Sequence, residues 1–435
     1  MMMVNSSGTA FSKFLLLWSG QLISAIGSGL TSFGLGIYIY QQTGQASAMA
    51  LVTLLAFMPS LLLSPVAGVL ADRYDRRLLM VLGDSLSATG LIFILICLLN
   101  GEAQLWQICI GVTISSVFSS LLDPAYKATV TDLLSEEQYT KASGFVQVAG
   151  SAKYLISPVI AGFLLVVSDV KLLLIIDICT FFVTVATTLA VRSGLASKQP
   201  EQAQAFIREF KDGWRAVSGK RGVLVLVIMT SVMTFFIGFI ETLSMPMILS
   251  FSDSAVLGTL ETIIASGMLV SSVIIGMLPM KKGFVRILSV SLFGSGISMA
   301  AFGLRENIVL ISISGFLFFA MLPFTNTALD YLVRTNIDNS VQGRAWSLIG
   351  LVSQLGFVAA YTLSGVLADY VFTPLLVTGG VLAGSVGEVI GTGSGRGMGL
   401  LIIIAGLLLS AASLIIYNLK SIRSLENRGD VCTTE

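Results

Sequence analysis

Among the charged side chains inside long apolar stretches of the sequence are Lys153, Asp177, Glu241 and Glu261. A charge inside a membrane is costly, and such residues usually form ion pairs, carry protons or bind a substrate. Lys153 is the deepest charge, because the helical residues between it and Lys141 cover about 18 Å. Asp177 and Glu261 lie about 12 Å inside their own stretches. The pattern predicts ion pairing or proton transfer within a membrane.

The composition supports this membrane interpretation. The chain has 435 residues, of which 55% are hydrophobic and only 11% are charged, whereas soluble proteins carry about 25% charged residues. An integral membrane protein is therefore expected. A net charge of +1 favours no nucleic-acid partner, and the chain has no histidine and no cysteine pattern typical of a metal site. No phosphate-binding loop is present, so neither ATP nor another cofactor is expected.

The apolar stretches are long enough to be transmembrane helices, which need about 20 residues each. The sequence predicts twelve spans, at residues 14–40, 46–70, 77–99, 104–123, 141–167, 170–191, 222–245, 254–279, 284–304, 307–330, 343–369 and 399–419. The expected fold class is an all-α membrane protein with twelve transmembrane helices in two six-helix halves. The glycine-rich segment 374–397 is expected to be an external or re-entrant loop.

The basic residues orient these spans, because lysine and arginine gather on the cytoplasmic side. With both termini in the cytoplasm, 21 of the 25 basic residues lie on the cytoplasmic side of the membrane. The exceptions are Lys171, Arg305 and Arg396 outside, and Lys153 within a span. A thirteenth span would place the basic C-terminal tail outside the cell. For this reason segment 374–397 is not counted as a span. We expect a multi-pass protein of the cell membrane.

The chain divides into an N-terminal half at 1–191, a cytoplasmic linker at 192–221, a C-terminal half at 222–420 and a cytoplasmic tail at 421–435. In the linker, Phe206, Phe210 and Trp214 recur every four residues, which predicts an amphipathic helix at the membrane surface. The halves indicate an internal duplication, since AGFLL at 161–165 aligns with SGVLA at 364–368. Duplicated halves with a binding site near the midplane are typical of secondary transporters.

Several motifs resemble a known family. The motif GVLADRYDRR at 68–77 resembles the loop between the second and third helices of the major facilitator superfamily. Segments similar to its macrolide-efflux-like branch of drug exporters lie at 14–30, 155–165, 208–217 and 342–350. The resemblance covers nearly the whole chain and implies alternating access between two halves.

The resemblance also implies a cytoplasmic latch at this motif. Asp72 would lie against the N-terminal end of the eleventh helix, near Arg344, where the helix dipole favours a negative charge. Arg73 would reach Asp123 at the end of the fourth span. The alternative is that the cluster only anchors the chain by the positive-inside rule, which is the role assigned to the arginines at 76–77.

Two partners are open for Lys153, since depth alone does not choose between them. A pair with Asp177 would lie within one half and would be structural. A pair with Glu261 would join the two halves and would break when the carboxylate is protonated. In the same fifth span, Ser157, Pro158 and Gly162 stand where antiporters of the superfamily often have Gly-Pro, and we expect a helix kink there.

The expected substrate cavity lies on helices that line the cavity in the resembled fold. Glu241 on the seventh span suits a cationic substrate or a proton, and its alternative role is an interfacial residue that reaches water. Aromatic side chains could line an apolar cavity, although packed or lipid-facing phenylalanine is commoner. The candidate residues besides Glu241 are Gln21, Phe235, Phe236, Phe239, Phe319 and Asn326.

These observations lead to one functional expectation. The chain is expected to be a monomeric secondary active transporter, not an enzyme, that exports small amphipathic compounds such as drugs or macrolides. The proton gradient is the expected energy source, so the protein would be a multidrug antiporter. The alternatives are a gradient-independent lipid scramblase and an uptake transporter of the same fold.

Overall fold

The computed structural model describes residues 4–192, 214–215, 217–219, 221–277, 282–337 and 342–429. Within these ranges, twelve segments are helical, long enough and apolar enough to cross a membrane, which confirms the expected fold class. Phe206 and Phe210 of the expected linker helix lie outside the described residues, and Trp214 is exposed. The chain forms two units, and each is described by itself.

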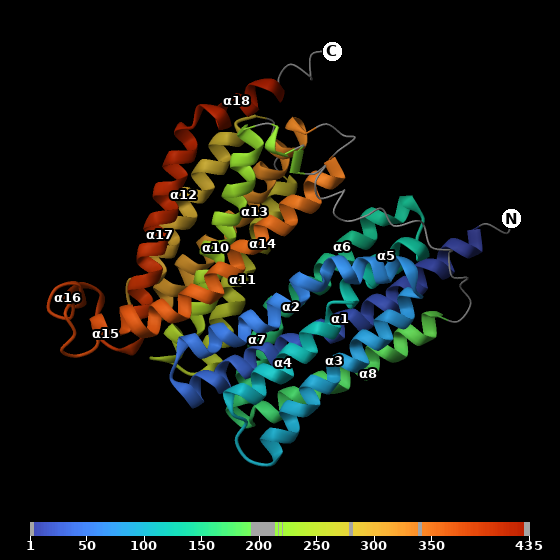
Figure 1. The fold of residues 1–435 in the computed structure, drawn as a ribbon, viewed down its shortest axis with the longest axis horizontal. Helices are drawn as coiled ribbons and strands as arrows, with labels where there is room; N and C mark the ends of the chain where they lie inside the picture. The colour runs from blue at the N-terminus through green and yellow to red at the C-terminus, as the bar shows by residue number, and fades with distance from the viewer. Residues whose placement is uncertain are drawn as a thin grey trace. The chain divides into compact units, whose positions relative to one another are not determined.

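Unit 1 comprises Met1–Gly44, Leu51–Ala203 and Ser254–Thr259. Its helices are α1 Val4–Thr43, α2 Ala46–Arg73, α3 Arg76–Leu99, α4 Leu105–Ser119, α5 Leu122–Leu133, α6 Glu136–Leu155, α7 Ser157–Val167 and α8 Val170–Arg192. Figure 1 colours this stretch from blue to green. The first turn of the later helix α11 also belongs to this unit.

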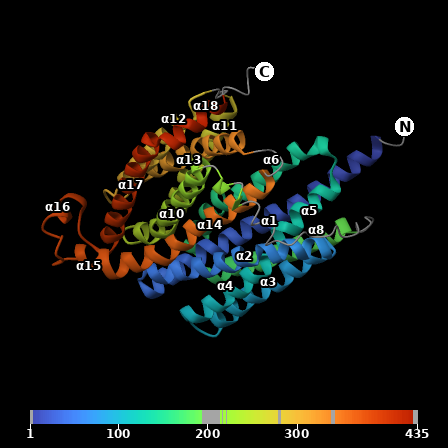
Figure 2. The ribbon, with the colours of Figure 1, turned by 45° about the horizontal axis from the view of Figure 1, so that its top comes forward.

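Unit 2 comprises Gln45–Ala50, Gln204–Asp253 and Leu260–Glu435. Its helices are α10 Arg221–Leu249, α11 Ser254–Met277, α12 Phe284–Phe302, α13 Ile308–Asn336, α14 Gln342–Leu367, α15 Thr373–Leu376, α16 Val386–Ile390, α17 Ser394–Asn418 and α18 Lys420–Gly429, with a π-helical turn η1 at Ala368–Phe372. The first turn of α2 belongs to this unit. Figures 1 and 2 show α15 and α16 at the end of the unit opposite to α18.

Small residues bring the helices of each unit close together, as membrane helices require. In unit 1, a Cβ added to Gly20 of α1 would lie 2.2 Å from Oγ1 of Thr187 on α8. In unit 2, a Cβ added to Gly296 of α12 would lie 2.5 Å from the carbonyl oxygen of Gly406 on α17. Any larger side chain at these glycines would separate the helix pair.

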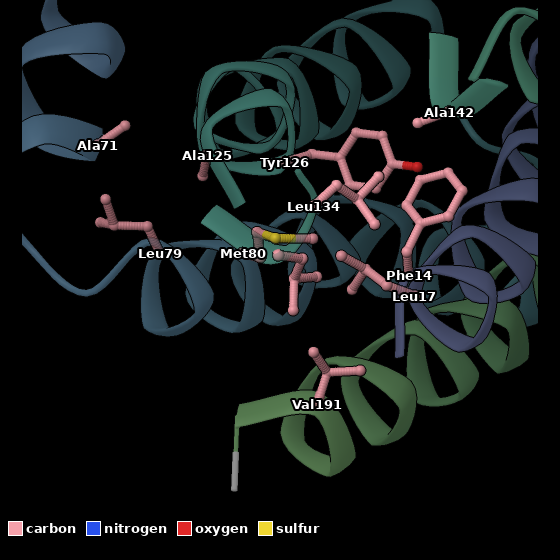
Figure 3. Close-up of a cluster of buried hydrophobic side chains, with 11 residues drawn as sticks. Phe14, Leu17, Ala71, Leu79, Met80, Ala125, Tyr126, Leu134, Ala142 and Val191 are labelled. Carbon is pink, nitrogen blue, oxygen red and sulfur yellow. The ribbon is translucent and has the colours of Figure 1, made fainter. Parts of the chain in front are cut away.

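The cytoplasmic side of unit 1, as the sequence orients it, has an apolar core (Figure 3). Phe14 and Leu17 of α1 meet Met80 of α3, Tyr126 of α5 and Val191 of α8, and all five are buried. Burial of such side chains stabilises the packing of helices that are distant in the sequence. The polar layer considered below lies one helical turn beyond this core.

Some helix boundaries differ from the sequence-based expectation. The fourth span continues through α5 to Leu133. The twelfth span begins at Ser394, so the end of the expected loop 374–397 is helical, and its Arg396 is buried. The Nη2 atom of Arg396 donates hydrogen bonds to the carbonyl oxygens of Gly303 at 2.7 Å and Leu304 at 2.9 Å. Because these bonds stabilise the buried guanidinium group, the helix can begin at Ser394 and include the charged Arg396.

The C-terminal tail also contains a docked helix that the sequence analysis did not predict. Ile422 and Leu425 of α18 are buried, while Lys420 and Arg423 lie on its exposed side. The side-chain nitrogen of Asn336 donates to the carbonyl oxygen of Leu425 at 3.2 Å. The helix is amphipathic and covers one end of unit 2.

Candidate functional site

The candidate site in unit 2 lies where α10 and α14 pack closely. A Cβ added to Gly238 of α10 would lie 2.6 Å from the Cβ of Ala360 and 3.2 Å from the ring of Phe357 on α14. Because Glu241 follows Gly238 by one helical turn, it lies on the same face of α10. The lack of a side chain at Gly238 therefore brings the aromatic residues of α14 next to this carboxylate.

Glu241 is oriented by a hydrogen bond from α14. The hydroxyl of Tyr361 donates to Oε2 of Glu241 at 2.9 Å. Tyr361 is buried, whereas Glu241 is exposed. A buried tyrosine body with its hydroxyl on an exposed carboxylate holds the negative charge in one place. This geometry suits the binding of a positively charged group.

Aromatic rings surround this part of the α10–α14 seam. The ring of Phe235 lies 4.6 Å from that of Phe239 and 5.4 Å from that of Phe236. The rings of Phe357 and Tyr361 are 5.8 Å apart. Aromatic faces attract organic cations and bury apolar surface. A carboxylate beside aromatic rings can therefore hold an amphipathic cation.

A second carboxylate of unit 2 interacts electrostatically with Glu241. Glu261 lies on α11, and its charge and that of Glu241 repel each other. Two like charges within interaction distance attract a positive charge more strongly than one. Sequence reasoning selected both residues separately, and the structure places them in one unit, near enough for their charges to interact.

The other cavity candidates have different environments. Phe319 on α13 packs against the buried ring of Phe318, at 5.3 Å between centroids. Asn326 on the same helix is exposed. Gln21 belongs to unit 1, on α1, and its Nε2 atom is buried without a hydrogen-bond partner among the described residues. Phe236 is buried, while Phe235 is half-buried.

Asp177 and Lys153 interact within unit 1. Asp177 on α8 is 1% exposed, and the hydroxyls of Ser28 and Thr180 each donate to its Oδ1 at 3.4 Å. The charge of Lys153 acts on this carboxylate. This influence is compatible with the structural alternative for Lys153, but the pair with Asp177 stays a prediction. A pair with Glu261, which belongs to unit 2, stays a prediction.

The fifth span is interrupted at the expected position. Helix α6 ends at Leu155 and α7 begins at Ser157, with Pro158 in its first turn. The hydroxyl of Ser157 donates to the carbonyl oxygen of Ile26 on α1 at 2.9 Å. Gly162 allows the backbone of Ser254 to approach, since a Cβ there would lie 2.5 Å from the Ser254 carbonyl oxygen.

The motif at 68–77 forms local contacts in unit 1. Asp72 lies 3.8 Å from Arg76, and Asp123 pairs with Lys127 at 2.7 Å, in place of the expected contact with Arg73. Arg73 is exposed. Arg344 lies in α14, and its side chain is outside the described residues. The latch between the halves stays a prediction.

Arg76 does more than anchor the chain, contrary to its expected role. Its Nη1 pairs with Asp132 of α5 at 2.7 Å and donates to the carbonyl oxygen of Ala128 at 3.2 Å. Its Nε donates to the carbonyl oxygen of Ala71 at 3.1 Å. The side chain therefore joins the end of α2 to α5, which sequence position alone does not reveal.

Sequence reasoning missed three residues with clear structural roles. Tyr361 carries no signal that would distinguish it from other tyrosines. Asp84 lies within the third predicted span, so the rule that selected Glu261 would have found it. Asp369 ends the second GVLAD string and caps α2 in unit 2, accepting from the backbone nitrogens of Ala46 at 3.1 Å and Ser47 at 2.7 Å.

Comparison with known proteins agrees with this architecture. Macrolide efflux protein A of Streptococcus pyogenes is 28% identical over 369 residues, which are 82% of this chain and 89% of that protein. Macrolide efflux protein A of Enterococcus faecalis is 29% identical over 322 residues, 71% of this chain and 98% of that protein.

The fold also matches solved transporter structures. The crystal structure of the nucleoside transporter NupG is similar with a TM-score of 0.73 and 12% identity, covering 94% of this chain and all of that one. At that identity the similarity supports the fold alone. A family model described as Major Facilitator Superfamily matches residues 17–361. With this match over most of its length, its twelve apolar helices and its motif at 68–77, the chain is a multi-pass membrane protein of the Major Facilitator Superfamily.

Proposed function

We propose that this protein is an exporter of small amphipathic cations, driven by the proton gradient through alternating access. The observation that carries the proposal is the Glu241 carboxylate, held by Tyr361 beside the rings of α10 and α14. The relatives named macrolide efflux protein A support export as the direction. The protein acts as a monomer in the cell membrane, with cytoplasmic termini and without a cofactor or enzymatic activity.

The site favours a molecule that carries one positive charge on an apolar body. The carboxylate of Glu241 provides a charged acceptor, and a hydrogen bond or ion pair with it contributes about 1.5–3 kcal/mol. The rings of Phe235, Phe239 and Phe357 bind apolar surface without fixed directional bonds. A site of this kind accepts several related compounds, because only the charge has to be placed accurately.

A cationic substrate and a proton would each neutralise the negative charge of Glu241 and Glu261, and proton coupling would follow from this. A proton on Glu241 or Glu261 removes the negative charge that attracts a cationic substrate. Substrate and proton therefore compete for the same pair of carboxylates, since binding of one reduces the affinity for the other. Competition of this kind makes a carrier an antiporter, in which inward proton movement drives outward substrate movement.

The test is transport in proteoliposomes with an imposed pH gradient. The substrate panel contains a macrolide, amphipathic amines and uncharged analogues of similar size. Wild-type protein should accumulate the cationic compounds only with the gradient. Glu241→Gln should lower kcat/KM for them by about tenfold or more, which corresponds to about 1.4 kcal/mol or more.

A matched control distinguishes the effect of losing Glu241 from the effect of losing any negative charge in unit 2. Glu388 is an exposed carboxylate of unit 2 on α16, away from the α10–α14 seam. Glu388→Gln should transport like wild type. Equal transport by Glu241→Gln and wild type would refute the proposed substrate site, and lipid movement without any gradient would favour a scramblase.

A further inference from the structure

A layer of buried polar side chains lies just beyond the apolar core of unit 1. Figure 3 shows Leu17, Met80 and Val191 directed into this core from α1, α3 and α8. Residues three or four positions apart lie on the same face of a helix. The next turn therefore directs Gln21 from α1, Asp84 from α3 and Thr188 from α8 toward one layer.

The polar atoms of this layer are buried and unsatisfied. Asp84 is 1% exposed, and Thr188 is fully buried. Both carboxylate oxygens of Asp84, Oγ1 of Thr188 and Nε2 of Gln21 have no hydrogen-bond partner among the described residues. Buried polar groups in folded proteins nearly always have partners, so three such side chains on neighbouring helices indicate a ligand.

Several titratable groups lie on α3 and on the helices around it, and no ion pair with Asp84 is found among the described residues. The buried Arg77 lies two helical turns from Asp84 on α3 itself. The titratable groups on the helices packed against α3 are Lys13, Tyr38 and Tyr40 of α1, Cys109 of α4, Asp123, Tyr126, Lys127 and Asp132 of α5, and Lys171, Asp177, Cys179 and Arg192 of α8. The charge of Asp177 repels that of Asp84. Lys127 and Lys171 pair with Asp123 and Asp169 respectively.

We propose that Asp84 is a proton-binding carboxyl group of the transport cycle, in a polar layer that it shares with Gln21 and Thr188. This inference rests on the proposed proton coupling and adds a site in unit 1 to the carboxylates of unit 2. An ionised carboxylate without a partner is very costly at this depth, and a bound proton removes that cost.

The neighbours of Asp84 favour a proton over a metal ion. A hard metal cation such as Ca²⁺ or Mg²⁺ needs six or so oxygen ligands, whereas the layer offers two carboxylate oxygens and one hydroxyl. The amide of Gln21 presents a donor nitrogen, which repels a metal ion and suits a carboxyl group. Release of the proton leaves a charge that the layer cannot accommodate as packed. The contact of α3 with α8 thus depends on the protonation of Asp84.

The test combines infrared difference spectroscopy with transport, using the full-length protein in lipid vesicles. Wild type should show carbonyl bands of protonated carboxyl groups, and Asp84→Asn should lack one component that Glu241→Gln and Glu261→Gln retain. Asp84→Asn should also lower accumulation driven by the pH gradient by about tenfold or more, within the usual range of coupling energies. Substrate exchange without a gradient should continue. The control Asp169→Asn, an exposed carboxylate of unit 1, should resemble wild type in both measurements.

A second variant keeps the test valid if Asp84→Asn does not fold. Thr188→Val preserves the carboxyl group but removes a neighbour, so the band should remain and shift in frequency. An unchanged band in both variants would overturn the assignment, as would transport that follows an imposed Na⁺ gradient and ignores the pH gradient. The infrared band requires no transport, so its presence in a protein without export activity would refute the proposed function and retain this proton site.

Discussion

Glu241 and Tyr361 illustrate how a single residue acquires its role from a neighbour on another helix. The hydroxyl of Tyr361 restrains the carboxylate, and Gly238 lets the two helices approach. Glu261 adds a second negative charge within interaction distance. At this scale, the two carboxylates have different expected roles. Glu241 contacts the substrate, and Glu261 adjusts the competition between substrate and proton.

The division of roles predicts a specific phenotype for Glu261→Gln. Accumulation driven by the pH gradient should fall by about tenfold or more, because one carboxylate of the coupled pair no longer binds a proton. Substrate binding at equilibrium should change little, since the Glu241–Tyr361 contact remains. Transport in proteoliposomes and a binding titration measure the two effects separately. Unchanged gradient-driven transport would show that Glu261 takes no part in coupling.

At the scale of elements, Asp369 fixes the start of a helix that is distant in the sequence. Its carboxylate accepts two backbone N–H groups in the first turn of α2. Gly365 permits this approach, because a Cβ there would lie 2.5 Å from the Cα of Ser47. A carboxylate at a helix N-terminus satisfies free N–H groups and interacts favourably with the helix dipole. The second GVLAD string therefore has a structural role different from the first.

This cap predicts a difference between two substitutions at one position. Asp369→Ala should lower the free energy of unfolding by about 1 kcal/mol, because it removes an N-cap. Asp369→Asn keeps an oxygen acceptor and should lose less than half of that amount, chiefly the interaction with the dipole. Thermal unfolding of the purified variants in detergent measures both. Equal stability of Asp369→Ala and wild type would mean that the cap contributes nothing.

At the scale of the whole molecule, each unit has its own set of membrane-embedded carboxylates. Unit 1 holds Asp84 and Asp177, and unit 2 holds Glu241 and Glu261. The twelve spans and the distribution of basic residues require both termini to lie on one side of the membrane. Under the proposed function, with cytoplasmic termini, protons that move down their gradient would pass from the outer face to the face that carries the termini, by way of one of these sets of carboxylates.

The orientation is testable with single cysteines in a variant that lacks the natural ones. Glu102 is an exposed residue between the third and fourth spans, and Glu137 is an exposed residue in the first turn of α6, where the fifth span begins. The two residues therefore lie at opposite ends of the fourth span. A maleimide that does not cross membranes should label Glu102→Cys in intact cells. It should label Glu137→Cys only after the membrane is opened. The reverse pattern would place the termini outside.

The sequence alone determined the class of this protein, because the length and polarity of a span are local properties. The twelve spans followed from composition, and the motif at 68–77 indicated the superfamily that the family model matches. The kink at Ser157 was also predictable, since proline often kinks or interrupts a helix. Proline alone does not decide it, because Pro246 and Pro323 lie inside continuous helices. The ends of spans were less predictable, because buried contacts such as those of Arg396 extend a helix beyond its apolar part.

Only the tertiary structure decided which polar groups meet. Tyr361 and Glu241 are 120 residues apart, and Asp369 and Ala46 are 323 residues apart. The two oxygens of Asp84 are buried without hydrogen-bond partners in the part of the chain that the structure describes, which the sequence does not reveal. Spacing in the sequence specifies the depth of a charge in the membrane and the helix face that carries it. The partner depends on which helices pack together, and close approach at small residues such as Gly238 determines that packing.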